Sequence, residues 1–186
     1  MIMNKSRSLI AGLLLLFIQT GSALADSDER FAGIKAGFEL TNAEGRPVTG
    51  QVLLGHYTLM AFGFTHCLHI CPMMAANMAM ALKISPPNAQ GIFVSVDTER
   101  DTPAITQAYA SSYSDSMIGL GGSYEQIRQA ANNFNISYVV TKSQKAYTVE
   151  HTSDIFLIGP DGQVRKVFAL NASPKAMAEA MKPSTD

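Results

Sequence analysis

The chain has 186 residues, with 14 lysine and arginine residues against 15 aspartate and glutamate residues, so its formal net charge is −1 at pH 7. This balance argues against nucleic acid or another polyanion as the partner. The length fits one domain of ordinary size with a sizeable core, so a second domain is not expected.

The first 25 residues have the pattern of a secretory signal peptide. Lys5 and Arg7 form its charged start, residues 9–18 form an apolar run, and residues 23–25 (Ala-Leu-Ala) form a small-residue cleavage site. The apolar run is shorter than the roughly 20 residues that a membrane-spanning helix needs. We therefore predict cleavage after Ala25 and export to the periplasm. Anchoring in the inner membrane through an uncleaved N-terminal segment is the alternative.

A flexible leader is expected at residues 26–37, and the folded domain is expected to span residues 38–186. Residues 38–40 and 42–48 predict an opening strand and turn, and residues 57–64 form a short apolar run typical of a buried strand. Residues 72–82 are rich in methionine and alanine and predict a helix that starts at the second cysteine, with Pro72 in its first turn. Residues 91–96 predict the next buried strand.

The second half of the domain continues the alternation of strands and helices. Helices are predicted at residues 102–113 and 123–133, a strand at residues 117–120, and extended chain at residues 136–140. Residues 154–158 and 163–170 predict a hairpin around a Gly-Pro-Asp-Gly turn, followed by a helix that starts at Ser173. This order indicates an α/β fold: a thioredoxin-like three-layer sandwich with a central mixed sheet and an N-terminal strand or hairpin extension.

The two cysteines, Cys67 and Cys71, lie four residues apart at a strand-to-helix junction, a spacing that turns both thiols to one side. A domain of this size needs no disulfide to be stable, and a bridge across so short a loop would stabilise it little. The helix N-terminus favours thiolate, the form that binds metal and attacks disulfides. Redox-active pairs of this fold usually have two intervening residues, so the three found here favour metal.

Two thiolates and one imidazole suit Cu(I) and can also hold Cu(II). By pattern alone, His69 and His151 are rival candidates for the imidazole, while His66 is expected to brace the loop and His56 to lie on the surface. Four methionines follow the cysteines, and their helical spacing is more typical of core packing than of copper ligation. They are Met73, Met74, Met78 and Met80.

Three motifs resemble those of the Sco/SenC family, in the order in which that family has them. Residues 62–72 (FGFTHCLHICP) resemble its FGYTHCPxxCP motif, and residues 96–103 (VDTERDTP) resemble its VDPERDTP segment. Residues 149–152 (VEHT) and 156–162 (FLIGPDG) are similar to its VDHS/T and YLIxPDG block. Leu68, Thr98 and Glu150 depart from these patterns, but none of these changes removes a ligand.

The resemblance implies a thioredoxin fold that binds one copper ion per monomer, as Cu(I) or Cu(II), through Cys67, Cys71 and His151. It also implies that Asp97 supports this site from behind the ligands. Residues 99–101, next to Asp97, form either a docking surface or a solvated turn.

The role that the resemblance implies is maturation of the binuclear copper site of cytochrome c oxidase. The protein would deliver copper to the copper-site subunit or to another exported copper protein, would reduce the target's cysteines, or would do both. A thioredoxin-like reductant is then an expected partner. The alternatives are a thiol-disulfide oxidoreductase and a peroxide-defence protein, both using Cys67 and Cys71 as a reversible disulfide pair.

Overall fold

The computed structural model describes residues 36–144 and 146–182. The predicted signal peptide and residues 26–35 of the predicted leader lie outside the described residues. Ala36 is buried, and its N–H donates to the Gly162 carbonyl at 3.2 Å. Packing of the described chain therefore begins by residue 36, two residues before the expected domain start. Within the described ranges, no helix combines the length and the apolarity needed to cross a membrane.

A five-stranded sheet forms the centre of the domain, in the order β5-β4-β3-β8-β9. The strands are β3 (Tyr57–Gly63), β4 (Ala89–Ser95), β5 (Met117–Leu120), β8 (Ile155–Ile158) and β9 (Val164–Phe168). β3, β4 and β5 are parallel, whereas β8 runs antiparallel to β3 and β9 antiparallel to β8. This mixed sheet confirms the predicted α/β fold of thioredoxin type.

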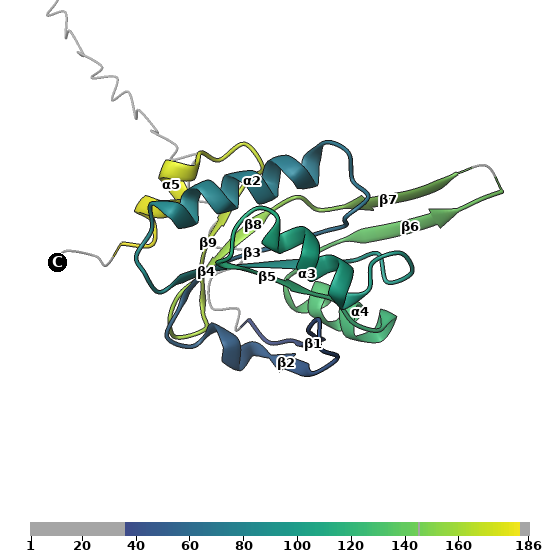
Figure 1. The fold of residues 1–186 in the computed structure, drawn as a ribbon, viewed down its shortest axis with the longest axis horizontal. Helices are drawn as coiled ribbons and strands as arrows, with labels where there is room; N and C mark the ends of the chain where they lie inside the picture. Colours follow the sequence, from purple (N-terminus) through teal and green to yellow (C-terminus); the bar gives the residue numbers. More distant parts are fainter. Residues whose placement is uncertain (1–35, 145, 183–186) are drawn as a thin grey trace, which may run out of the picture.

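Helices cover one face of the sheet, and a helix with a small hairpin covers the other (Figure 1). The first layer contains α2 (Ile70–Lys83), α3 (Pro103–Ser111) and α5 (Pro174–Glu179). The opposite layer contains α4 (Tyr124–Asn133), β1 (Glu39–Thr41), β2 (Pro47–Thr49) and the 3-10 turn η1 (Gly50–Leu53). Side chains alternate along β3, so Leu59 and Ala61 pack toward α2 while Met60 and Phe62 pack toward α4.

The antiparallel ribbon of β6 (Tyr138–Lys142) and β7 (Tyr147–His151) projects beyond the sheet (Figure 1). The sequence predicts only extended chain at residues 136–140 in this region and does not predict the second strand. Half-buried and exposed residues alternate along both strands, which places Tyr147, Val149 and His151 on the inward face. This alternation fixes the direction in which His151 points.

Helix α2 starts at Ile70, with His69 at its N-cap, and thus begins just before Cys71. Met74 and Met78 are fully buried against the sheet, as expected for core residues. Met73 and Met80 are instead about half exposed, at 48% and 51%. The interpretation of the four methionines as core filler is therefore correct for two of them and wrong for the other two.

Candidate metal centre

The end of β3 and the first turn of α2 position the two cysteines. The Cys67 N–H donates to the Phe64 carbonyl at 3.3 Å, which closes the loop after the strand. The Cys71 N–H then donates to Cys67 Sγ at 3.4 Å. Both side chains are free thiols; Cys71 is fully buried and Cys67 is partly exposed. Cys71 is therefore shielded from solvent, whereas Cys67 keeps partial access to it.

His151 reaches the site from the end of β7, and its Nε2 lies 3.4 Å from Cys71 Sγ. Its Nδ1 lies 2.8 Å from the Thr152 carbonyl oxygen. Because a carbonyl can only accept, Nδ1 carries the ring hydrogen and the Nε2 lone pair faces the sulfur. The Phe64 ring stands edge-on to the imidazole, with 5.8 Å between ring centroids. The imidazole is thus held in the tautomer and orientation that a metal ligand needs.

The protein shifts the pKa values of the two thiols in opposite directions. Burial raises the pKa of Cys71 to about 12. Burial also acts to raise the pKa of Cys67, but hydrogen bonds, the strongest from the Cys71 N–H, outweigh it and leave this pKa below its usual value. Burial lowers the pKa of His151, although the Thr152 carbonyl opposes the shift. Cys67 is therefore the readier thiolate, and His151 is neutral at pH 7.

The spacing of the Cys71–His151 pair suits a metal ion. Metal–thiolate and metal–imidazole bonds of about 2.3 Å and 2.0 Å, set at a tetrahedral angle, place the two ligand atoms about 3.5 Å apart. The 3.4 Å between Cys71 Sγ and His151 Nε2 is close to that span. Among residues 36–144 and 146–182, no three His, Cys, Asp or Glu side chains form a complete metal-binding group. A metal held by all three predicted ligands would require a rearrangement of the side chains.

Gly63, the last residue of β3, provides the space that Cys71 occupies. A Cβ atom at this position would lie 2.9 Å from Cys71 Sγ and 2.8 Å from Phe93 Cζ. Both separations are shorter than ordinary van der Waals contacts, which start near 3.4 Å. The absence of a side chain at Gly63 is therefore what allows the sulfur to sit over the end of the sheet.

Asp101 anchors the cysteine loop, a role that the sequence did not reveal. Its buried carboxylate accepts the Thr65 N–H at 2.7 Å, the Thr65 hydroxyl at 2.6 Å and the Ser95 hydroxyl at 2.6 Å. His66 Nδ1 lies 3.2 Å from the same carboxylate. Neither interpretation of residues 99–101 as a docking surface or a solvated turn holds for Asp101, whereas His66 braces the loop as expected.

Asp97 stabilises the ribbon, and the hydrogen-bond partners of its carboxylate among the described residues are Arg100 and Tyr147 and not the cysteines or His151. Its buried carboxylate accepts the Tyr147 hydroxyl at 2.6 Å and pairs with Arg100. Burial acts to raise the pKa of Asp97, but these two hydrogen bonds outweigh burial and lower it. The Arg100 guanidinium also stacks over the Tyr147 ring, 3.9 Å from its centroid. Asp97 therefore acts on the strand that carries His151, and Tyr147 is a supporting residue that sequence reasoning missed.

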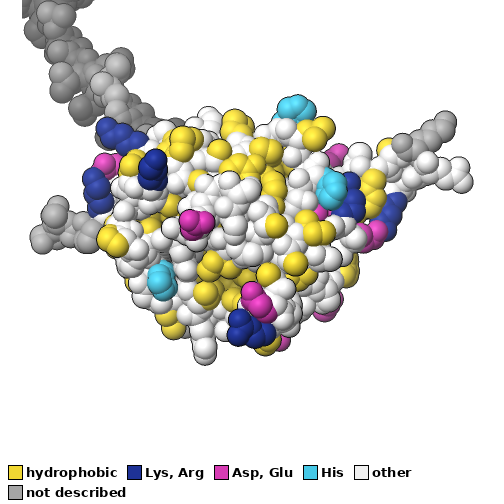
Figure 2. All heavy atoms as spheres, viewed as in Figure 1, with side chains coloured by type: hydrophobic (Ala, Val, Ile, Leu, Met, Phe, Trp, Pro, Cys, Tyr) yellow, Lys and Arg dark blue, Asp and Glu magenta, His cyan; other side chains and the backbone are white. Residues whose placement is uncertain are grey.

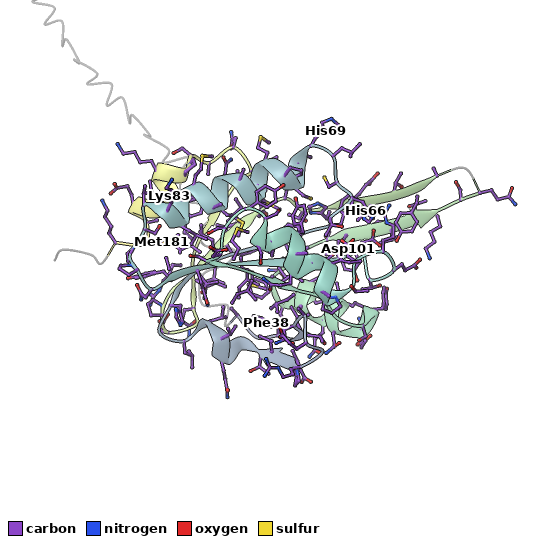
Figure 3. All side chains as sticks on the ribbon, viewed as in Figure 1. Phe38, His66, His69, Lys83, Asp101 and Met181 are labelled. Carbon is purple, nitrogen blue, oxygen red and sulfur yellow. The ribbon has the colours of Figure 1, made fainter. Side chains whose placement is uncertain are left out.

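His69, the rival candidate for the imidazole ligand, is exposed at the N-terminal end of α2. Figure 3 shows its side chain directed away from the body of the protein, while His66 lies near Asp101. The structure thus brings Cys71 and His151 together and leaves His69 outside that pair.

The chain is similar to proteins of one known family. The family model described as SCO1/SenC matches residues 26–186. The mitochondrial SCO1 homolog 1 of Arabidopsis thaliana is 31% identical over 155 residues, covering 81% of this chain and 46% of that protein. The chain thus spans about half the length of such curated relatives.

Two solved structures resemble the domain. Bradyrhizobium japonicum ScoI with copper bound has a TM-score of 0.71 and 32% identity, covering 80% of this chain and 97% of that one. BsSco, described as a cytochrome c oxidase assembly protein with a disulfide switch, has a TM-score of 0.60 and 28% identity, covering 80% and 92%. From the family match, the conserved fold and the cysteine–histidine pair, we conclude that the chain belongs to the SCO1/SenC family.

Proposed function

We propose that this protein binds copper through Cys67, Cys71 and His151 and supplies it during assembly of the binuclear copper site of cytochrome c oxidase. The observation that carries the proposal is the 3.4 Å approach of His151 Nε2 to Cys71 Sγ. These two atoms come from elements 80 residues apart, and the Cys67 sulfur lies beside the Cys71 backbone. Copper bound to B. japonicum ScoI and the assembly role ascribed to BsSco support the proposal.

The different exposures of the ligands suit a protein that passes its metal on. Cys71 and His151 form the inner side of the site, and the more exposed Cys67 forms its outer side. Copper in this setting is cargo, and the donor set of soft thiolates and neutral imidazole matches Cu(I). An acceptor's ligands would approach from the Cys67 side, so that Cys67 is the first ligand released and the buried pair the last.

The proposed acceptor is the copper-site subunit of cytochrome c oxidase or another exported copper protein. Delivery in the periplasm follows from the expected signal peptide, and retention at the inner membrane is the alternative. Neither location changes the ligand set of the site, because the proposed ligands all lie in the folded domain. The identity of the acceptor therefore has to be tested by copper transfer to a purified target protein.

Reduction of the target's cysteines is the second candidate function, and the lowered pKa of Cys67 favours it. The Cys67 thiolate would attack a target disulfide, forming a mixed disulfide and releasing one target thiolate. Cys71 would then lose its proton and attack Cys67 Sγ, which releases the second target thiolate and leaves a Cys67–Cys71 disulfide. The pair supplies both electrons, and an exported dithiol reductant would restore it.

Copper titration of the reduced protein tests the first proposal. We expect one tightly bound Cu(I) per monomer, measured by competition with a chromophoric Cu(I) chelator, and loss of that site in Cys67→Ala, Cys71→Ala and His151→Ala. His56→Ala is the matched control, because His56 contacts the Asn88 carbonyl on the surface and should leave binding unchanged. Undiminished affinity in His151→Ala would refute the ligand set.

Reduction of an oxidised target peptide separates the two functions. If thiol exchange is the physiological step, His151→Ala should retain the reduction rate while Cys67→Ala and Cys71→Ala lose it. If copper transfer is the step, only the variants that bind copper should metallate the target, and His151→Ala should fail even with a fully reduced target.

A further inference from the structure

We propose a second, weaker Cu(I) site formed by the His69 imidazole and the Met73 thioether on the outer face of α2. It builds on the proposed copper function and gives Cu(I) an exposed position beside the cysteine loop, on its way into or out of the buried site. Nothing in the Cys67, Cys71 and His151 set requires either residue.

His69 differs from the other three histidines because its ring forms no hydrogen bond or ion pair with the described residues. His56 contacts the Asn88 carbonyl, His66 contacts Asp101, and His151 contacts Thr152 and Cys71. His69 occupies the N-cap of α2, and its side chain makes no capping hydrogen bond to the helix. Its imidazole points outward (Figure 3) and can offer either nitrogen to a metal.

Met73 is the thioether placed to meet that imidazole. The Met73 N–H donates to the His69 carbonyl at 3.4 Å, so the two residues are related as i and i+4 on one helical turn. Side chains so related lie on the same helix face, with Cβ atoms about 5–6 Å apart. Met73 is 48% exposed, whereas Met74 is fully buried. An exposed thioether and an unengaged imidazole therefore share one face.

The surroundings favour a soft, singly charged ion. Leu68 and Ile70 flank the pair and are 82% and 40% exposed. Hydrophobic side chains spread over α2 (Figure 2), and His69 lies at the N-terminal end of this helix (Figure 3). Imidazole and thioether are both neutral, so they bind Cu(I) without neutralising its charge. An imidazole and a thioether hold Cu(I) less tightly than a ligand set that contains two thiolates. Cu(I) would therefore move from His69 and Met73 toward the cysteines.

Met80 provides the matched comparison within the same helix. It is 51% exposed, nearly the same as Met73, but the residue four positions before it is Ala76. If exposure alone made a methionine bind metal, Met73 and Met80 would bind it equally well. If the site needs both a histidine and a methionine, Met73 should bind metal and Met80 should not.

The test uses silver(I), a redox-inert substitute for Cu(I), and protein carrying ¹³C-methyl methionine. In a Cys67→Ser/Cys71→Ser variant we expect silver(I) to shift the Met73 methyl resonance and to leave the Met80 resonance in place. Adding His69→Ala should weaken the Met73 response at least tenfold, and adding His56→Ala, which removes a surface contact with the Asn88 carbonyl, should not. In the wild-type protein the Met73 shift should appear only after the first equivalent of silver(I).

Equal responses of Met73 and Met80, or a Met73 response unaffected by His69→Ala, would overturn the paired site. The cysteine-free variant makes this result independent of the primary site. Failure of the first equivalent to bind wild-type protein would refute the proposed function instead, while leaving the Met73 measurement interpretable.

Discussion

Substitution of Gly63 by alanine tests whether the end of β3 sets the position of Cys71, one of the proposed metal ligands. The new Cβ would lie 2.9 Å from Cys71 Sγ, and ordinary contacts begin near 3.4 Å, so the sulfur must move by about 0.5 Å. Ligand distances in well-formed metal sites lie within about 0.2 Å of their standard values, so a displacement of this size disturbs the ligand geometry. We therefore expect Cu(I) affinity to fall at least about tenfold, equivalent to about 1.4 kcal/mol, alongside an overpacking cost of about 1–3 kcal/mol in stability.

The assay pairs Cu(I) competition with urea unfolding of the reduced apoprotein, and Gly91→Ala is the control. A Cβ atom at Gly91 would lie 2.8 Å from Met117 Cγ and 3.0 Å from Leu82 Cδ1, a similar clash that touches no ligand. Gly91→Ala should lose stability and keep its copper affinity. Gly63→Ala binding Cu(I) within twofold of wild type would refute the reasoning.

Three further predictions concern the groups around the ligands. Asp101→Asn should lower the free energy of unfolding, measured with urea, by about 2–3 kcal/mol, because an amide nitrogen replaces an acceptor of buried hydrogen bonds. Glu99→Gln is the control: it alters an exposed pair with Lys142 and should lower that free energy by less than about 0.5 kcal/mol. Tyr147→Phe removes the hydroxyl that helps lower the pKa of Asp97. In wild type that lowering stabilises the fold above the unfolded-state pKa of aspartate, and the contribution disappears as pH falls through the folded-state value. Tyr147→Phe should therefore show a smaller loss of stability on acidification and faster amide exchange in β7; unchanged exchange would contradict the role of the ribbon contact. Finally, Cu(I) binding at pH 7 should release at least about one proton, measured in weakly buffered solution, because the Cys71 pKa of about 12 keeps that thiol protonated until metal binds. Release well below one proton would argue against Cys71 as a ligand.

Local sequence signals predicted most of the sheet and the position of both cysteines. The apolar run before Cys67 and the helix-forming residues after it specify a strand and a helix whose junction needs no distant information. The β6–β7 ribbon was not fully predicted because its second strand alternates half-buried and exposed residues, with no apolar run. Its existence depends on pairing with residues 138–142, which a local pattern does not encode.

Contacts between distant segments explain what the sequence left undecided at the site. Residue chemistry left His69 and His151 as rivals, and only the family resemblance favoured His151, because its contact with Cys71 spans 80 residues. Asp101 lies in a charged segment that is typical of a solvated turn. Its partner Thr65 is 36 residues away, so its burial follows from tertiary structure alone.

The separation of His151 from the cysteines also has a consequence for biosynthesis. During synthesis, Cys67 and Cys71 emerge from the ribosome before β7 has been made and has joined the domain. At that stage the chain offers a dithiol but lacks the imidazole that sits 3.4 Å from Cys71 in the folded protein. The full affinity for metal should therefore arise only when the last third of the chain has folded, so that copper loading reports the completion of folding.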